Sequence, residues 1–274
     1  MDVADIIIAF VAPIALGSGL GFVEQRAFAA PRASAVTMGL AIAAIYLLHE
    51  GFPPFPAITS KHKVAYALAA IPVLGLIAFN QVSYRRAALL AVVAAVTFLW
   101  LVLRPLTAGR LDWTWLLPLG TIAVWTPMLA KAPDLSRSPF TWPVAHLAMS
   151  VTASVLALLG GFLGLGQVLL SLSALLAGYA LAMFVATLKN GSPNQGHPMM
   201  TWVVQGGLLI LLVQLSTFAT NLSTAAYLLL LAMAGLPLAD AKLSRLPMLV
   251  QPFAFAALAM LAGIPAILLA LRNF

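Results

Sequence analysis

The side chains of this chain that could bind a small polar molecule are few, and they lie within or beside long apolar runs. They are Asn80, Gln81, His146, Gln205, Gln214, Thr220 and Asn221. Each can hydrogen-bond a substrate, or equally a neighbouring helix, since such bonds contribute about 0.6 to 2 kcal/mol in membranes. Asn80 with Gln81 and Thr220 with Asn221 are separated by 140 residues and occupy equivalent ends of two predicted helices. We treat all seven as candidate substrate-binding residues.

The sequence contains few residues that could carry acid–base catalysis or bind a metal ion. None of the seven acidic residues lies in the middle of a predicted helix, which argues against a carrier driven by a mid-membrane carboxylate. His49 and Glu50 could act as a general base and its partner at the lipid surface, and they are equally explained as solvated loop residues. With four histidines and no cysteine, we expect no metal site and no other cofactor. We assign no catalytic residue and expect a protein that is not an enzyme.

Prolines inside the apolar runs are candidate helix breaks. The fifth and tenth predicted helices carry two prolines each, namely Pro118, Pro127, Pro252 and Pro265. A proline within a helix removes one backbone hydrogen bond and tends to kink the helix. Transporters use such breaks to expose carbonyl groups to a ligand, although membrane helices tolerate proline in general. We therefore predict that these four positions mark breaks near a binding site.

The elements that must position these residues are transmembrane helices. The chain has 274 residues, of which 63% are hydrophobic and 8% charged, with a mean hydropathy of +1.05, whereas soluble domains carry about 25% charged residues. The apolar runs reach the roughly 20 residues that a helix needs to cross a hydrocarbon core of about 30 Å. The net charge of +7 comes from basic residues scattered at the ends of these runs. That distribution indicates contact with membrane lipid and no nucleic-acid partner.

Ten helices are predicted from apolar runs that are bounded by charge, proline or glycine. They lie at 4–23, 34–50, 62–81, 86–105, 113–131, 141–163, 165–188, 199–218, 222–239 and 248–271. Only the short segment TFATN at 217–221 marks the junction of the eighth helix with the ninth, so it stays open whether both of them span. Of the 14 basic residues, nine fall in the odd-numbered loops and five in the even loops and C-terminal tail. This bias predicts a multi-pass protein of the cytoplasmic (inner) membrane with both termini outside the cytoplasm.

An internal repeat is suggested by motifs that recur at about half the chain length. The matches have offsets of 143, 140 and 132 residues: LGSGLG at 16–21 with LGGFLG at 159–164, LHEGFP at 48–53 with LKNGSP at 188–193, and Pro-Leu at 105–106 with Pro-Leu at 237–238. The polar pairs that begin at Asn80 and Thr220 follow the same order. Four matches in one order, at slowly shrinking offsets, favour a duplicated unit.

Such a repeat divides the single membrane domain, 1–274, into two five-helix halves at 1–137 and 138–274. Because five is odd, the second half inserts upside down relative to the first, which gives an inverted-topology repeat like those of secondary transporters. In helix number and length this plan resembles the drug/metabolite transporters and the bile-acid and auxin carriers. The chain carries no motif of these families, and outward termini do not suit the first group.

The predicted function is therefore that of a small secondary transporter. It would move a small, weakly polar or amphiphilic metabolite by alternating access between the two halves, with membrane lipid and the substrate as its partners. A non-catalytic subunit that packs with other membrane subunits in a larger complex explains the apolar, nearly loop-free chain equally well. A lipid-modifying enzyme that works at the His49 and Glu50 face is the third hypothesis.

Overall fold

The structure, a computed structural model, describes most of the chain as helix. The described residues are 6–26, 31–56, 59–81, 115–135, 140–190, 198–218 and 222–272, together with isolated residues between 89 and 100. No strand occurs among them. The predicted helix at 86–105 falls mainly outside the described residues, so that prediction is not tested.

The described helices begin and end within a few residues of the predicted ones. They are η1 (Ile7–Val11, a π-helix), α2 (Ala12–Arg26), α3 (Pro31–Glu50), α4 (Ser60–Gln81), α6 (Leu116–Leu135), α7 (Thr141–Leu159), α8 (Leu163–Asn190), α9 (Pro198–Phe218), α10 (Thr224–Ala232), η3 (Met233–Ala239, a 3-10 helix), α11 (Asp240–Leu243) and α12 (Gln251–Leu271). The predicted segment 222–239 contains the main difference, because its helix turns into a 3-10 helix at Met233.

Six helical segments among the described residues are long and apolar enough to cross a membrane. They are Ile7–Glu24, Arg32–Glu50, Thr141–Leu159, Leu163–Lys189, Met199–Phe218 and Gln251–Leu271. Two further apolar segments, Leu116–Trp125 and Thr224–Leu236, are shorter. The chain is thus an α-helical protein suited to a membrane, while the predicted number of ten spans is not established.

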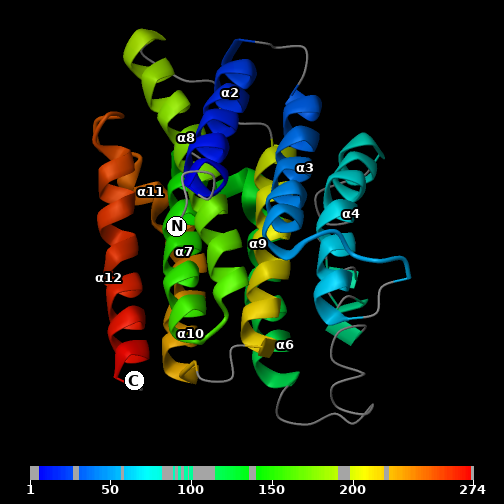
Figure 1. The fold of residues 1–274 in the computed structure, drawn as a ribbon. Helices are drawn as coiled ribbons and strands as arrows, with labels where there is room; N and C mark the ends of the chain where they lie inside the picture. The colour runs from blue at the N-terminus through cyan, green and yellow to red at the C-terminus, as the bar shows by residue number, and fades with distance from the viewer. Residues whose placement is uncertain are drawn as a thin grey trace.

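The helices form a bundle whose long members run roughly along one axis, with α12 at one edge and α4 at the other (Figure 1). The spanning segment of α9 is 94% buried, whereas that of α12 is 28% buried. Packing contacts join α9 to α3, α4, α6 and α7. The helix α9 is therefore the core of the bundle, and α12 leaves most of its surface outside the packed interior.

The closest helix pair is α2 with α8, which lie side by side although 160 residues separate them (Figure 1). A methyl group added at Gly17 would overlap the carbonyl oxygen of Leu175, and one added at Gly178 would overlap the carbonyl oxygen of Ile14. Only glycine lets the two backbones approach this closely, as in other membrane helix pairs with small residues four positions apart. The Ser18 hydroxyl also donates to the carbonyl oxygen of Gly178 at 3.1 Å.

Several polar side chains in this part of the bundle are paired with one another. The Tyr179 hydroxyl of α8 donates to the carboxylate of Glu24 on α2, and both residues are buried. Between α7 and α8, the hydroxyls of Ser150 and Ser173 lie 2.8 Å apart. Because a buried polar group without a partner costs about 1 to 3 kcal/mol, these pairs let the helices bury polar groups at their contacts.

The predicted inverted repeat is not supported by the packing of the described helices. The repeat equates α2 with α7 and α3 with α8, yet α7 packs mainly along α8, whereas α2 packs mainly along α8 and not along α3. The matched glycines also differ in role. Gly17 permits the contact of α2 with α8, whereas its match Gly160 is the C-cap of α7, just before the turn to α8. Glycine motifs recur here because tight turns and close helix contacts both require glycine.

Candidate functional site

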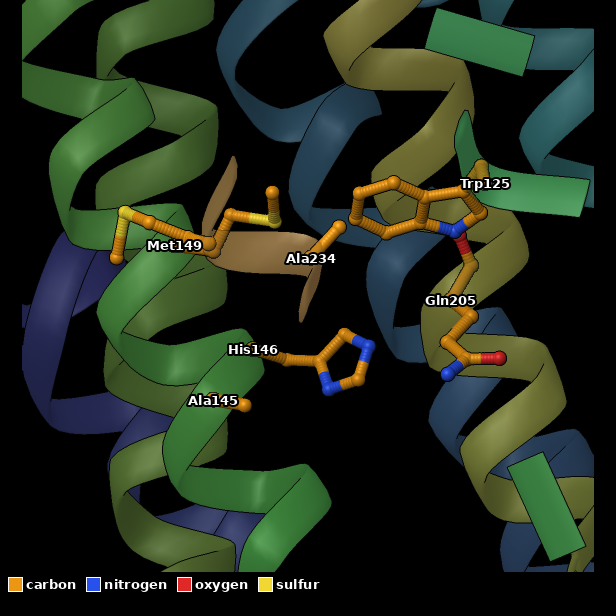
Figure 2. Close-up of a pocket in the computed structure, with 7 residues that line it drawn as sticks. Trp125, Ala145, His146, Met149, Gln205 and Ala234 are labelled. Atoms are coloured by element: carbon orange, nitrogen blue, oxygen red, sulfur yellow. The ribbon is translucent and has the colours of Figure 1, made fainter. Parts of the chain in front are cut away.

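A small cavity lies inside the bundle, between α6, α7, α9 and the junction of α10 with η3 (Figure 2). Its lining residues are Trp125, Ala145, His146, Met149, Gln205, Met233 and Ala234. These lining residues include no aspartate, glutamate, lysine or arginine. The free space is that of about one water molecule. The cavity can therefore hold a single small polar group in the present conformation.

His146, the sixth residue of α7, presents one ring nitrogen to this cavity. The other nitrogen, Nδ1, lies 2.6 Å from the carbonyl oxygen of Trp142, one turn earlier in α7. Because a carbonyl oxygen can only accept, Nδ1 must carry the proton, and Nε2 of the neutral ring is then an acceptor. The ring also makes edge contacts with Trp125 and Trp142, at centroid distances of 6.3 and 6.2 Å. These contacts fix the ring so that its acceptor faces the cavity.

Gln205, the eighth residue of α9, lines the opposite wall. Its backbone carbonyl oxygen accepts a hydrogen bond of 3.1 Å from the indole Nε1 of Trp125, which holds the tryptophan as a third wall. Figure 2 shows the side-chain amide nitrogen of Gln205 on the side that faces His146. The side chain is 4% exposed, and its Oε1 has no hydrogen-bond partner. Gln205 thus turns its amide nitrogen toward the cavity and its unpartnered Oε1 to the opposite side.

The remaining walls are apolar, and two of them are methionines. Met149 comes from α7, while Met233 and Ala234 stand where α10 changes into the 3-10 helix η3. Methionine is unbranched and adapts its shape easily. A stretch of 3-10 helix within a longer helix often marks a hinge. The apolar side of the cavity therefore combines adaptable side chains with an irregular stretch of helix.

The structure brings together two of the seven predicted binding residues, His146 and Gln205. Gln214, on the same helix α9, instead donates from Nε2 to the Tyr46 hydroxyl at 3.2 Å, and that hydroxyl donates to the carbonyl oxygen of Lys61 at 3.1 Å. Gln214 is not a lining residue of the cavity. The side chains of Asn80 and Gln81 and the residues Thr220 and Asn221 lie outside the described residues, so their predicted role is not tested.

The four predicted helix breaks have different surroundings. Pro118 is the third residue of α6 and Pro252 the second of α12. The amide groups of a first helical turn have no intrahelical partner, so proline interrupts nothing there. Pro265 lies inside α12 and is exposed. Pro127 lies within α6, and its side chain is outside the described residues. The backbone beside the cavity is irregular at η3, where the helix α10 becomes a 3-10 helix. None of the four predicted prolines lies in η3.

Two features of this region were not predicted from the sequence. The first is Trp125, which is 1% exposed and forms a wall of the cavity. The second is the buried pair of Glu24 and Tyr179. It reaches the cavity region through Trp142, whose ring lies tilted against Tyr179 at 5.1 Å between centroids. Glu24 stands near the end of α2, where a carboxylate usually meets water, so its position gave no signal of burial.

His49 and Glu50, the proposed acid–base pair, each contact another helix or loop. The Nε2 atom of His49 lies 2.8 Å from the hydroxyl of Ser171 in α8. Glu50 forms an ion pair of 3.4 Å with Lys61 and also lies against Gly164 at the start of α8. These contacts join the end of α3 to α4 and α8. They do not test the acid–base role, which stays a prediction.

Comparisons with known proteins add no assignment. No protein-family model, curated protein or solved structure matches the chain. Within the described part of the chain, no group of three or more His, Asp or Glu side chains is arranged to hold a metal ion. The function must therefore be argued from the cavity itself.

Proposed function

We propose that this protein is a membrane carrier that binds a small, weakly polar or amphiphilic metabolite at the cavity of His146 and Gln205. The observation that carries the proposal is the amide nitrogen of Gln205, which faces the Nε2 acceptor of His146 across the cavity, inside a bundle of apolar helices. Polar groups within membrane helices are costly and commonly mark substrate pathways.

Transport requires the cavity to widen, because its present size admits about one water molecule. The proposal assigns this movement to η3 and to the side chains of Met149 and Met233. A displacement of η3 away from α7 would open the apolar wall, while His146 and Gln205 keep their positions on α7 and α9. This movement would open the site to one membrane surface, and alternating access needs a second state in which the site is open to the opposite surface.

The proposal includes the number of membrane crossings and the side of the membrane on which the termini lie. We infer ten crossings in the cytoplasmic (inner) membrane, with both termini outside, as the apolar runs and the basic residues predict. Six crossings would be the long helices, and the others would be α4, α6, the segment of α10 with η3, and residues 86–105. Alternating access in this arrangement does not need two symmetric halves, because it rests on the movement of η3.

Entrance counterflow in proteoliposomes tests the proposal directly, since exchange needs no knowledge of the energy source. Vesicles are loaded with one neutral metabolite of a broad panel, and uptake of its labelled form is followed. We expect transient accumulation for at least one compound, and its loss in Gln205→Leu. Gln167→Leu, at an exposed position of α8, is the matched control and should keep the exchange. Absence of exchange across the panel, or equal exchange by Gln205→Leu, would reject the proposal.

The alternative is a non-catalytic subunit of a larger membrane complex. The observation that favours it is the small size of the cavity, which leaves no room for a metabolite without movement. This hypothesis predicts a stable partner after extraction in mild detergent. Purification as a single species that performs counterflow would exclude it.

A further inference from the structure

The chemistry of the cavity walls also restricts the substrate class. We propose that the cavity recognises a neutral hydroxyl group, so that the substrate is a small alcohol with an apolar body. This inference rests on the proposed carrier function and makes it more specific. It follows from which atoms donate and which accept at the two polar walls.

His146 offers an acceptor to the cavity, because its Nδ1 is bonded to the carbonyl oxygen of Trp142 at 2.6 Å. Gln205 offers an amide N–H donor on the facing wall (Figure 2). A hydroxyl group both donates and accepts through one oxygen atom. Its O–H can donate to Nε2 of His146 while its oxygen accepts from the amide of Gln205. The free space, which is that of about one water molecule, matches one hydroxyl group.

Other polar groups fit these walls less well. A carboxylate has only acceptors, so it would face the lone pair of His146, and none of the lining residues is a lysine or arginine that could neutralise it. An ammonium group would bring a charge into a cavity whose lining residues include no carboxylate, and an unpaired buried charge is very costly. An ether oxygen could accept from Gln205 but has nothing to donate to His146. The walls therefore favour a hydroxyl group.

The apolar body of the alcohol would lie against Met149, Met233 and Ala234. These side chains are almost fully buried, with exposures of 2%, 2% and 7%. The flexible methionines can change rotamer at small cost, so a chain of a few carbon atoms can be admitted from the side of η3. The hydroxyl would anchor the molecule, and its apolar part would replace the contacts that the methionines lose.

Two isomers of the same composition, 1-butanol and methyl propyl ether, separate recognition of a hydroxyl from simple partition into an apolar space. The protein in lipid nanodiscs is labelled with ¹⁵N in its histidine rings, and the signals of His146 are assigned from the spectrum of His146→Gln. We expect 1-butanol to shift the Nε2 signal in a saturable way and the ether to leave it unchanged. Gln205→Leu should weaken the binding of 1-butanol about tenfold, which corresponds to one hydrogen bond of about 1.4 kcal/mol, and Gln167→Leu should not.

Equal shifts with both isomers, or no saturable shift with either, would overturn the hydroxyl assignment. The second result would mean that the cavity holds only water. These outcomes are separate from failure of the carrier function. A saturable shift of His146 without exchange of any compound leaves an alcohol-binding site and rejects transport. Exchange of a compound without a hydroxyl, with no shift of His146, leaves the carrier and rejects the alcohol assignment.

Discussion

The contact of α2 with α8 and the cavity between α7 and α9 use polar residues in opposite ways. At the first, glycines bring two backbones into contact, and the polar groups of Ser18 and Tyr179 are hydrogen-bonded. At the second, the walls are larger side chains, some space is left free, and the Oε1 of Gln205 has no partner. The helices are similarly apolar in both regions.

The difference indicates that the contact of α2 with α8 holds the fold together, whereas the cavity between α7 and α9 is a candidate binding site. Close packing with satisfied polar groups stabilises one arrangement of helices, because any shift would create overlap or lose hydrogen bonds. Free space beside unsatisfied polar groups contributes little stability, and it leaves capacity to bind a ligand. Substitutions in the first region should therefore reduce stability, whereas those in the second should reduce function while stability is kept.

The largest effect is expected for Gly17→Ala. The added methyl group would overlap the carbonyl oxygen of Leu175, and the overlap of a side chain with backbone costs about 1 to 3 kcal/mol or more. Gly19→Ala is the matched control, because no atom lies within 4 Å of its added methyl group. Alanine favours helix by about 1 kcal/mol over glycine, so this control should be neutral or stabilising. Thermal unfolding in detergent measures both variants. Equal behaviour of the two would contradict the close contact of α2 with α8.

A somewhat smaller loss is expected for Tyr179→Phe. This variant keeps the ring but removes the hydroxyl that donates to the buried carboxylate of Glu24. Loss of a donor to a buried charged group costs about 1.5 to 3 kcal/mol. Tyr66→Phe is the control, since Tyr66 is 39% exposed and its hydroxyl donates to the carbonyl oxygen of Pro54. The two unfolding temperatures should differ by several degrees. If Tyr179→Phe is as stable as the control, the pair does not stabilise the scaffold.

The cavity should respond differently. In the double variant His146→Leu with Gln205→Leu, we expect the free energy of unfolding to stay within about 1 kcal/mol of the original, because replacing polar groups by apolar ones of similar size can be neutral. Binding of 1-butanol and counterflow should both be lost. A destabilisation as large as that of Gly17→Ala would show instead that these polar groups are structural.

The smallest effect on stability is expected for Met233→Leu, a swap that conserves volume and usually costs less than about 1.5 kcal/mol. Leucine is branched and less adaptable, so the opening of the apolar wall should be slower and counterflow should fall severalfold. Met183→Leu, at a buried position of α8 away from the cavity, should leave the rate unchanged. Equal rates in the two variants would remove Met233 from the proposed movement.

The positions of the helices could be predicted from the sequence because long apolar runs and their charged or proline-containing ends are local signals. The switch from α10 to the 3-10 helix η3 could not, since the run 222–239 stays apolar throughout. The repeat prediction is not supported by the helix packing, for a related reason. Gly17 and Gly160 occupy matching motifs, yet a short motif does not tell a turn from a helix contact.

The candidate site was predicted only in part. His146 and Gln205 stood out as polar residues in apolar runs, but no local signal indicated that α7 and α9 face each other, because both helices are apolar on all sides. For the same reason Gln214 could not be distinguished from Gln205, although it bonds to Tyr46 instead. The burial of Glu24 depends on its contact with Tyr179, which is 155 residues away in the chain.

The most direct test of the account uses the fact that the chain has no cysteine. A single Ala234→Cys change places a thiol in the cavity wall, and Thr59→Cys places one at an exposed position as a control. In lipid vesicles, we expect a membrane-impermeant methanethiosulfonate reagent to modify both thiols, and the exchanged compound to slow modification at position 234 alone. Lack of modification at position 234 while position 59 reacts, or modification that the compound does not slow, would contradict a substrate site at this cavity.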